Sequence, residues 1–132
     1  MVVAENNKAY ITLRSNNTNC RNADNLLIIL DVKNFNNPLK INEYQMVNPH
    51  GLAVDENLLF ITEGGADVKL LDVKNPKNIK LLETIPVKNG YDVILHQKRA
   101  HIIADDGFYQ YTYKKMPPRF ISKIAITNKS HD

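Results

Sequence analysis

The sequence predicts an all-β protein built from repeated units of about four short antiparallel strands. The first observation is a repeat, because the five residues 30–34, Leu-Asp-Val-Lys-Asn, recur unchanged at positions 71–75. Each copy follows an aliphatic run and precedes a proline, and the period of about 41 residues is typical of stacked repeats and propellers. The second observation is the close spacing of turn-forming residues between short aliphatic runs, which disfavours helices along the chain.

The repeat extends to three units. Residues 4–12 align without a gap on residues 54–62, and then on residues 95–104 with one insertion. In the third unit, Thr112 stands where the second unit has the motif residue Asp72, and terminal repeats are often atypical in this way. We therefore expect one domain over residues 1–132, with units at about 2–46, 52–87 and 93–126 and a polar tail at 127–132 that frays.

The middle unit shows the elements most clearly. Aliphatic and β-branched residues predict strands at 52–54, 59–62, 68–73 and 80–85. Between them lie a polar turn at 55–57, a glycine-containing loop at 63–66 and a proline-containing turn at 75–78. Four strands is the number in one propeller blade. The strand at 26–30 has no polar face, which is expected if a neighbouring blade covers each of its sides. The fold class expected is a β-propeller-type array of about three four-stranded antiparallel blades.

The length predicts an incomplete, open propeller. A chain of 132 residues has room for about three blades, whereas closed propellers have four to eight. Residues equivalent to 48–51 are missing before Val2, so the chain opens inside the first strand of a blade. We expect the C-terminal part of a longer propeller, paired with upstream blades. The alternative is self-association through open blade edges and apolar faces.

Two equivalent runs end in the motif aspartates. They read Leu-Ile-Ile-Leu-Asp at 27–31 and Val-Lys-Leu-Leu-Asp at 68–72, both followed by Val-Lys-Asn. These runs resemble those of the LVIVD-repeat proteins, which are named for Leu-Val-Ile-Val-Asp. The resemblance covers nearly the whole chain and implies a β-propeller of bacterial or archaeal cell surfaces, often a lipoprotein, with no generally assigned enzymatic activity. Thr112 and the segment 114–118 depart from the family pattern in the third unit.

Composition indicates an ordinary globular domain without a membrane span. The chain is 43% hydrophobic and 23% charged, and no run approaches the roughly eighteen apolar residues of a spanning helix. The formal charge is only +3 with scattered basic residues, so we expect no nucleic-acid partner. The chain shows no signal segment, and an extracellular, cell-surface or periplasmic location is implied only by the family resemblance.

An asparagine-rich insertion at 15–24 contains Cys20, the single cysteine, which excludes an intrachain disulfide. The simplest interpretation is an exposed loop with an incidental thiol. The alternative is a functional loop in which Cys20 and Asp24 bind a ligand, since long loops often carry function. Residues 16–18 and 128–130 match the glycosylation sequence.

The blade topology predicts where a binding site would lie. Loops that enter the innermost strand and loops that join the second and third strands emerge on one face of a propeller, which we call the loop face. Side chains with oxygen or imidazole nitrogen atoms on this face would suit a divalent cation or a polar ligand. The loop face would collect the candidate ligand residues His50, Glu63, Tyr91, Asp92, Asp105 and Asp106.

Each of these candidates also has a structural interpretation. Asp105 and Asp106 precede Gly107 in what is most simply a tight turn whose carboxylates bond the local backbone. Asp92 can hold the start of a strand by bonding neighbouring amides, Glu63 fits a solvated loop residue, and His50 fits a loop anchor.

No cofactor, metal site or catalytic residue is predicted. The chain has no metal-ligand spacing such as His-x-x-x-His, no nucleophile elbow and no phosphate-binding glycine loop. The motif aspartates Asp31 and Asp72 recur at equivalent positions, which predicts a structural role as acceptors for the amides of the following turn. On this basis Asp72→Asn is expected to cost about 1 to 2 kcal/mol.

Two functions follow from the sequence. The first is a non-catalytic binding or scaffold module of a cell-surface or exported protein, which presents the loop face to a protein or glycan partner. The alternative is part of an enzyme or of a metal-dependent ligand-binding propeller whose other site residues lie in further blades.

Overall fold

The computed structural model describes residues 2–3, 6–14 and 25–126, and every regular element in this part of the chain is a β-strand. The all-β prediction is therefore confirmed. Cys20, Asp24, both glycosylation sequences and the tail at 127–132 lie outside the described residues.

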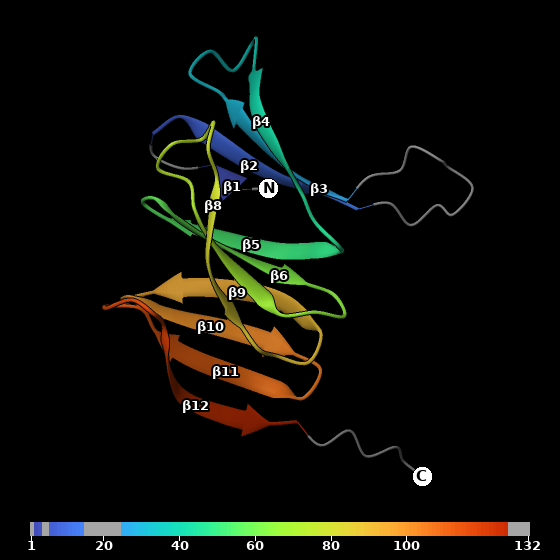
Figure 1. Ribbon diagram of the computed structural model, residues 1–132, viewed down its shortest axis with the longest axis vertical. Coiled ribbons are helices and arrows are strands. Elements are labelled where there is room, and N and C mark those ends of the chain that lie inside the picture. The colour runs from blue at the N-terminus through green and yellow to red at the C-terminus, as the bar shows by residue number, and fades with distance from the viewer. Residues whose placement is uncertain (1, 4–5, 15–24, 127–132) are drawn as a thin grey trace, which may run out of the picture.

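The strands form three four-stranded antiparallel sheets, in each of which consecutive strands pair and none of which closes into a barrel (Figure 1). The first sheet comprises β1 (Val2–Val3), β2 (Lys8–Leu13), β3 (Leu26–Asp31) and β4 (Leu39–Gln45). The second comprises β5 (Pro49–Asp55), β6 (Leu58–Glu63), β7 (Val68–Asp72) and β8 (Lys80–Ile85). The third comprises β9 (Gly90–His96), β10 (Arg99–Ala104), β11 (Gly107–Thr112) and β12 (Arg119–Ala125).

The strand boundaries of the middle unit agree with the sequence pattern to within one residue, except that β5 begins at Pro49 rather than at residue 52. Pro49 lies opposite Glu63 of β6, and a register shift separates this pair from the next pair, Leu52 and Ile61. A proline at the first position of a strand loses no ladder hydrogen bond, so the strand can extend through an irregularity that the pattern does not reveal.

Left-handed backbone conformations occur at a glycine and also at two turn residues that rarely adopt them. Gly65, in the loop between β6 and β7, has a φ of 76°. The β9–β10 hairpin turns at Gln97 and Lys98, whose φ values of 51° and 59° describe two consecutive left-handed residues, as in the turns that match strand twist. These short connections keep successive strands adjacent and give each sheet its meander topology.

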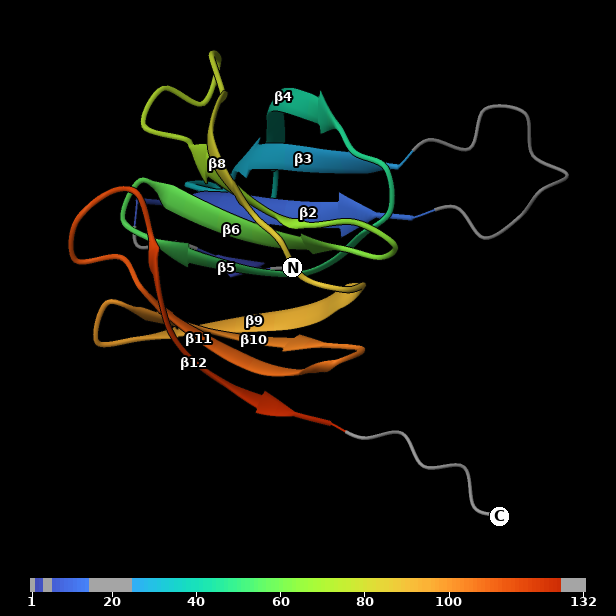
Figure 2. The ribbon, with the colours of Figure 1, turned by 60° about the horizontal axis from the view of Figure 1, so that its bottom comes forward.

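The three sheets follow one another along the chain, with the second sheet between the first and the third (Figures 1 and 2). A hydrophobic core fills each of the two spaces between them. The core shared by the first and second sheets contains Tyr10, Leu27, Ile29, Met46, Leu59, Ile61, Leu71 and Val73. The core shared by the second and third sheets contains Phe60, Val68, Leu70, Ile85, Val93, Ala100, Ile102, Ala104, Tyr109 and Tyr113.

Strand β6 is buried on both faces because it lies in the middle sheet. Its side chains alternate, so Leu59 and Ile61 pack toward the first sheet while Phe60 packs toward the third. All three are fully buried. The apolar residues on both faces of β6 are therefore explained by the sheets that cover its two sides.

For β3, the sheets that the structure describes cover one face, and the expected cover of the other face stays a prediction. Its residues Leu27 and Ile29 are fully buried against the second sheet. Leu26 and Ile28 point to the opposite face and are only half-buried. The reason is that no sheet among the described residues packs on that side.

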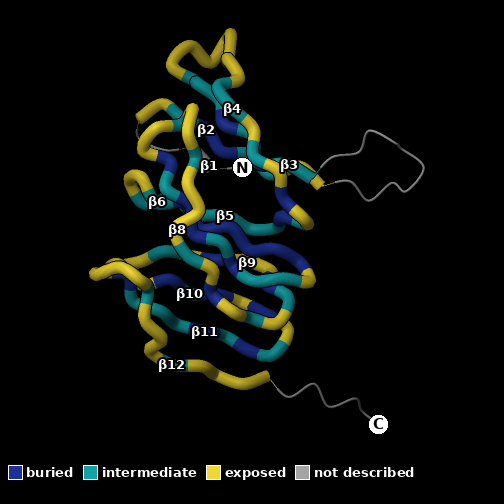
Figure 3. The backbone as a smooth tube through the Cα atoms, viewed as in Figure 1, coloured by how far each residue is buried: buried dark blue, intermediate teal, exposed yellow. Residues whose placement is uncertain are grey.

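Burial falls toward the fourth strand of each sheet (Figure 3). All but one residue of β12 is exposed, whereas β6 has one half-buried residue and five buried ones. Between the third and fourth strands, each sheet has a register shift at the equivalent position, which follows Ile29, Leu70 and Gln110. A bulge at this point increases the local twist and turns the outer strand away from its neighbour.

The motif aspartates brace the turn that follows the third strand. Asp31 Oδ1 accepts a hydrogen bond from the Lys33 amide at 2.9 Å, and Asp72 Oδ1 accepts one from the Lys74 amide, also at 2.9 Å. In the third sheet, Thr112 Oγ1 accepts from the Lys114 amide at 3.4 Å. The degenerate third copy of the motif thus keeps the equivalent hydrogen bond, which is longer and weaker.

We expect Asp72→Ala to lower the free energy of unfolding by about 1 kcal/mol, the usual cost of losing one such hydrogen bond. Asp72→Asn keeps a carbonyl oxygen at the same place, so its effect should be smaller than the sequence-based figure. Urea denaturation followed by circular dichroism measures both. The matched control is Lys74→Ala, which leaves the backbone donor intact. Equal stabilities of Asp72→Ala and Lys74→Ala would contradict the brace.

Gly51 allows the inner strands of the second and third sheets to approach. A Cβ atom at this position would lie 2.8 Å from the Asp92 Cα and 2.2 Å from its Oδ1. The first of these is a backbone atom, so a side chain here would push β5 and β9 apart. This contact sets how closely the loops at the ends of the two strands come together.

Candidate functional site

Two pairs of loops meet at the end of the sheets predicted to form the loop face. The amide of Gly64, after β6, donates to the carbonyl of Asn48, before β5, at 2.8 Å. The amide of Asp105, after β10, donates to the carbonyl of Lys88, before β9, at 2.8 Å. The loop that enters the first strand of a sheet is therefore tied by its backbone to the loop between the second and third strands.

Asn89 links the second sheet to the third. Its Oδ1 accepts from the Gly65 amide at 2.6 Å, and its Nδ2 donates to Asp105 Oδ2 at 3.1 Å. The Asn89 φ of 57° is left-handed, a conformation that asparagine tolerates better than most residues. One side chain thereby joins the β6–β7 loop, the β8–β9 loop and the β10–β11 turn.

Tyr91 and Asp105 form a hydrogen-bonded pair at the surface. The Tyr91 hydroxyl donates to Asp105 Oδ1 and lies 3.2 Å from Asn89 Nδ2. The hydrogen bonds from Tyr91 and then Asn89 lower the pKa of the Asp105 carboxyl, and the Asp105 carboxylate raises the pKa of the Tyr91 hydroxyl. The Tyr91 side chain stays 45% exposed, so its ring is free to contact a ligand while its hydroxyl is held.

His50 extends this cluster toward the first sheet. Its ring meets the Tyr91 ring edge to face, with centroids 6.4 Å apart, and its Nε2 lies 3.4 Å from an Arg14 guanidinium nitrogen. Burial, and then the Arg14 charge, lower the pKa of His50. A Cβ atom on Gly64 would lie 2.4 Å from His50 Nε2, so the glycine makes room for the imidazole.

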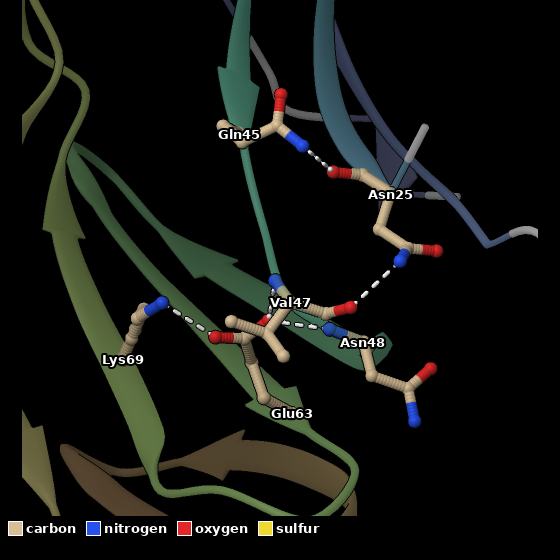
Figure 4. Close-up of polar contacts among 6 residues, drawn as sticks. All are labelled: Asn25, Gln45, Val47, Asn48, Glu63 and Lys69. Atoms are coloured by element: carbon tan, nitrogen blue, oxygen red, sulfur yellow. Dashed lines mark hydrogen bonds and ion pairs between the residues drawn. The ribbon is translucent and has the colours of Figure 1, made fainter. Parts of the chain in front are cut away.

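Glu63 has a different role from the solvated loop residue that the sequence suggests. Its side chain is fully buried, and Oε1 accepts from the amides of Val47 at 2.7 Å and Asn48 at 2.9 Å (Figure 4). Oε2 forms an ion pair with Lys69 Nζ at 2.5 Å. Burial alone would raise the pKa of Glu63, but the hydrogen bonds from Lys69, Asn48 and Val47 outweigh it and lower the pKa. Glu63 therefore fastens the linker between the first and second sheets.

The Asp92 carboxylate also accepts a hydrogen bond from a backbone amide. Asp92 Oδ1 accepts from the Val93 amide at 2.9 Å, which is the bond expected at the start of this strand. Its Cα and carboxylate lie against Gly51 of the second sheet.

Asp106 bonds mainly side chains, and its own backbone amide, the expected kind of partner in the turn, is the weakest of its contacts. Its Oδ2 accepts from the Tyr109 hydroxyl at 2.7 Å and from Lys123 Nζ at 2.9 Å. These hydrogen bonds, that from Lys123 first, lower the pKa of Asp106.

The structure thus brings together three of the six candidates, His50, Tyr91 and Asp105, and gives Glu63, Asp92 and Asp106 separate hydrogen-bonding roles. Sequence reasoning missed Lys69 as a partner of Glu63. The available signal was a lysine inside the aliphatic run 68–71, which implies a partner for its charge. Among the described residues, no three His, Cys, Asp or Glu side chains are placed to share a metal ion.

An open groove runs beside the cluster, between the second and third sheets. Its walls come from the β6–β7 loop, the β8–β9 loop and the β10–β11 turn. The lining residues are Gly65, Ala66, Asp67, Pro86, Val87, Lys88, Asn89, Asp105, Asp106 and Tyr109. Carboxylates, an amide, an ammonium group and a phenol together suit a ligand that both donates and accepts hydrogen bonds.

No protein-family model and no curated protein gives a significant match to the chain. The resemblance to LVIVD-repeat proteins stays a prediction that depends on the motif runs. In the part of the chain that the structure describes, no helix is long and apolar enough to cross a membrane.

Proposed function

We propose that the chain is a non-catalytic binding module whose three sheets are successive blades of a β-propeller, and that the loop face binds a polar partner. The observation that carries the proposal is the cross-linking of three loops by Asn89 and the pairing of Tyr91 with Asp105. A surface held in this way loses little conformational entropy when a ligand binds. The propeller arrangement is supported by the repeat period and by four-stranded meander sheets stacked on shared cores.

The groove favours a glycan as the partner. Sugar hydroxyls donate to carboxylates and accept from amides, and the groove offers both kinds of group in Asp105, Asn89 and Lys88. The half-exposed Tyr91 ring beside the groove supplies an apolar surface on which a sugar ring can lie. A protein loop with polar side chains is the other partner that fits the proposed function. The location at a cell surface is proposed from the family resemblance alone.

A glycan microarray tests this proposal. We expect the chain to bind a subset of glycans, and we expect Tyr91→Ala to lower the affinity at least tenfold because the ring contact and the support of Asp105 are both lost. The matched control is His96→Ala, since His96 is an exposed residue at the opposite end of β9. Unchanged glycan binding by Tyr91→Ala, or no glycan binding by the parent chain, would contradict the proposed site.

Metal analysis tests the enzymatic or metal-dependent alternative. A stoichiometric divalent ion that is retained through dialysis and lost in His50→Ala would replace the proposed function by a metal-dependent one. We expect the dialysed chain to bind its glycan equally well with and without a chelator.

A further inference from the structure

The third sheet presents an apolar face that no described sheet covers. Ile94, Ile103 and Ile124 on this face are 58%, 42% and 62% exposed. Ile103 pairs with Phe108, which in turn pairs with Ile124, so the three side chains lie in one row across β10, β11 and β12. His101 stacks on Phe108 with ring centroids 5.8 Å apart. We call these residues, Ile94, His101, Ile103, Phe108 and Ile124, the third-sheet face.

The first sheet presents a second apolar face at the other end of the molecule. Leu13 pairs with Leu26, and Ile11 pairs with Ile28. Their neighbours along the strands, Tyr10, Leu27 and Ile29, point to the other side and lie in the core with the second sheet. Leu13 is 45% exposed, and the others are half-buried. We call Ile11, Leu13, Leu26, Ile28 and Leu30 the first-sheet face.

The third-sheet face repeats one side of an interface that already exists in the chain. In the second sheet, Val68 pairs with Ile85, and both are buried in the core against the third sheet. Phe108 and Ile124 form the equivalent pair in the third sheet. The third sheet is therefore built to receive a further sheet on this side, as the second sheet receives the third.

The first-sheet face repeats the other side of the same kind of interface. In the repeat alignment, Ile11 corresponds to Ile61 and Leu30 to Leu71, which are both fully buried against the first sheet. The third-sheet face thus corresponds to the surface of the second sheet that packs on the third sheet. The first-sheet face corresponds to the surface of the second sheet that packs on the first sheet. The two faces are complementary to each other rather than to themselves.

We propose that two copies of this chain associate head to tail, with the third-sheet face of each packed on the first-sheet face of the other. The inference rests on the propeller arrangement in the proposed function. A heterologous contact of this kind closes into a ring when its rotation allows. Two copies with three sheets each give six sheets, which lies within the four to eight blades of closed propellers.

The third-sheet face has a composition that suits a face exposed before assembly. His101 pairs with Gln110 at the place where Phe60 pairs with Leu70 in the second sheet. Gln110 bonds Ser122 Oγ at 3.2 Å. Polar groups at these two positions reduce the apolar area that the separate chain would expose, while the row formed by Ile103, Phe108 and Ile124 stays apolar.

Complementary surface variants test the proposal by size-exclusion chromatography with light scattering. Ile124→Lys alters the third-sheet face and Leu13→Lys alters the first-sheet face, both at exposed positions that are not needed for the internal cores. We expect the unaltered 132-residue chain to have the mass of a dimer and each variant to have the mass of a monomer. An equal mixture of the two variants should again give a dimer, because one wild-type face of each kind remains.

The mixing result separates head-to-tail packing from other modes. If identical faces paired, one variant would stay dimeric alone and the mixture would contain no restored species. A monomeric parent chain, a dimer that survives in either single variant, a mixture that stays monomeric, or polymers larger than a dimer would each overturn the proposal. Phe35→Lys, at an 81% exposed position in a turn, is the control and should remain dimeric.

The folding and the glycan binding of each variant are measured separately from its molecular mass. Circular dichroism establishes that each variant is folded, and Ile103→Lys and Ile28→Lys replace the first pair if either variant is not. The loop face does not include either apolar face, so Tyr91→Ala should remain dimeric while losing glycan binding. Loss of the dimer with retained glycan binding would thus overturn this inference alone, and the reverse would overturn the proposed function alone.

Discussion

Phe60→Ala is expected to lower the free energy of unfolding by about 3 to 5 kcal/mol, the range for removing a buried aromatic side chain from a core. Phe60 is fully buried between the second and third sheets, and the centroid of its ring lies 5.1 Å from the centroid of the Tyr113 ring. Truncation removes the apolar contacts and leaves a cavity that the rigid strands on both sides cannot close. Urea denaturation followed by circular dichroism measures the loss.

Phe35→Ala is the matched control, since it removes the same atoms from a side chain that is 81% exposed. We expect it to change the unfolding free energy by less than about 0.5 kcal/mol. If the two alanine variants were equally stable, the second and third sheets would not share the core described here.

Glu63→Gln is expected to lower the free energy of unfolding by about 2 to 4 kcal/mol. This is less than the roughly 3 to 5 kcal/mol usual when one partner of a fully buried ion pair is removed, because the Lys69 side chain is 23% exposed. The glutamine amide can accept from Val47 and Asn48 through its oxygen, but its NH₂ group then faces the Lys69 ammonium. Two donors would meet where a carboxylate now accepts. The same urea titration measures this variant, and Glu43→Gln, in an exposed pair with Lys40, is its control.

The stability difference should also depend on pH. The folded pKa of Glu63 lies below its unfolded value of 4.5, so its contribution is fully present above that pH. The contribution is lost as pH falls through the folded pKa, because both states then carry the proton. The gap between the parent chain and Glu63→Gln should therefore be largest near pH 7 and narrow below pH 4.5. A gap that stays constant down to pH 2, or one no larger than that of Glu43→Gln, would contradict the role assigned to Glu63.

Contacts between residues close in sequence were predictable. The bond from Asp72 to the Lys74 amide spans two residues, and the left-handed Gly65 belongs to a loop in which only a glycine adopts that conformation without strain. The strand positions follow from runs of aliphatic residues between such turns. Each of these features depends on a few neighbouring residues, so the repeat displays them directly.

Contacts between sheets were not predictable from the pattern. Glu63 meets amides that lie fifteen and sixteen residues earlier in the chain, and Asn89 reaches Gly65 across 24 residues. Two glycines after a glutamate indicate an exposed loop, and no local signal shows that a linker passes over the carboxylate. The six candidate residues of the loop face do not form one cluster for the same reason. Tyr91 pairs with Asp105, whereas Asp106 bonds Lys123.

The sequence by itself determined the repeat, the four strands of each unit, the turns between them and the structural role of the motif aspartates, because those features arise from local backbone preferences and short-range hydrogen bonds. Only the tertiary structure decided which faces are covered, that Glu63 is buried, and that Asn89, Tyr91 and Asp105 form one cluster. Those outcomes depend on how closely the sheets approach, which is set by packing at positions such as Gly51 and Phe60 rather than by any single strand.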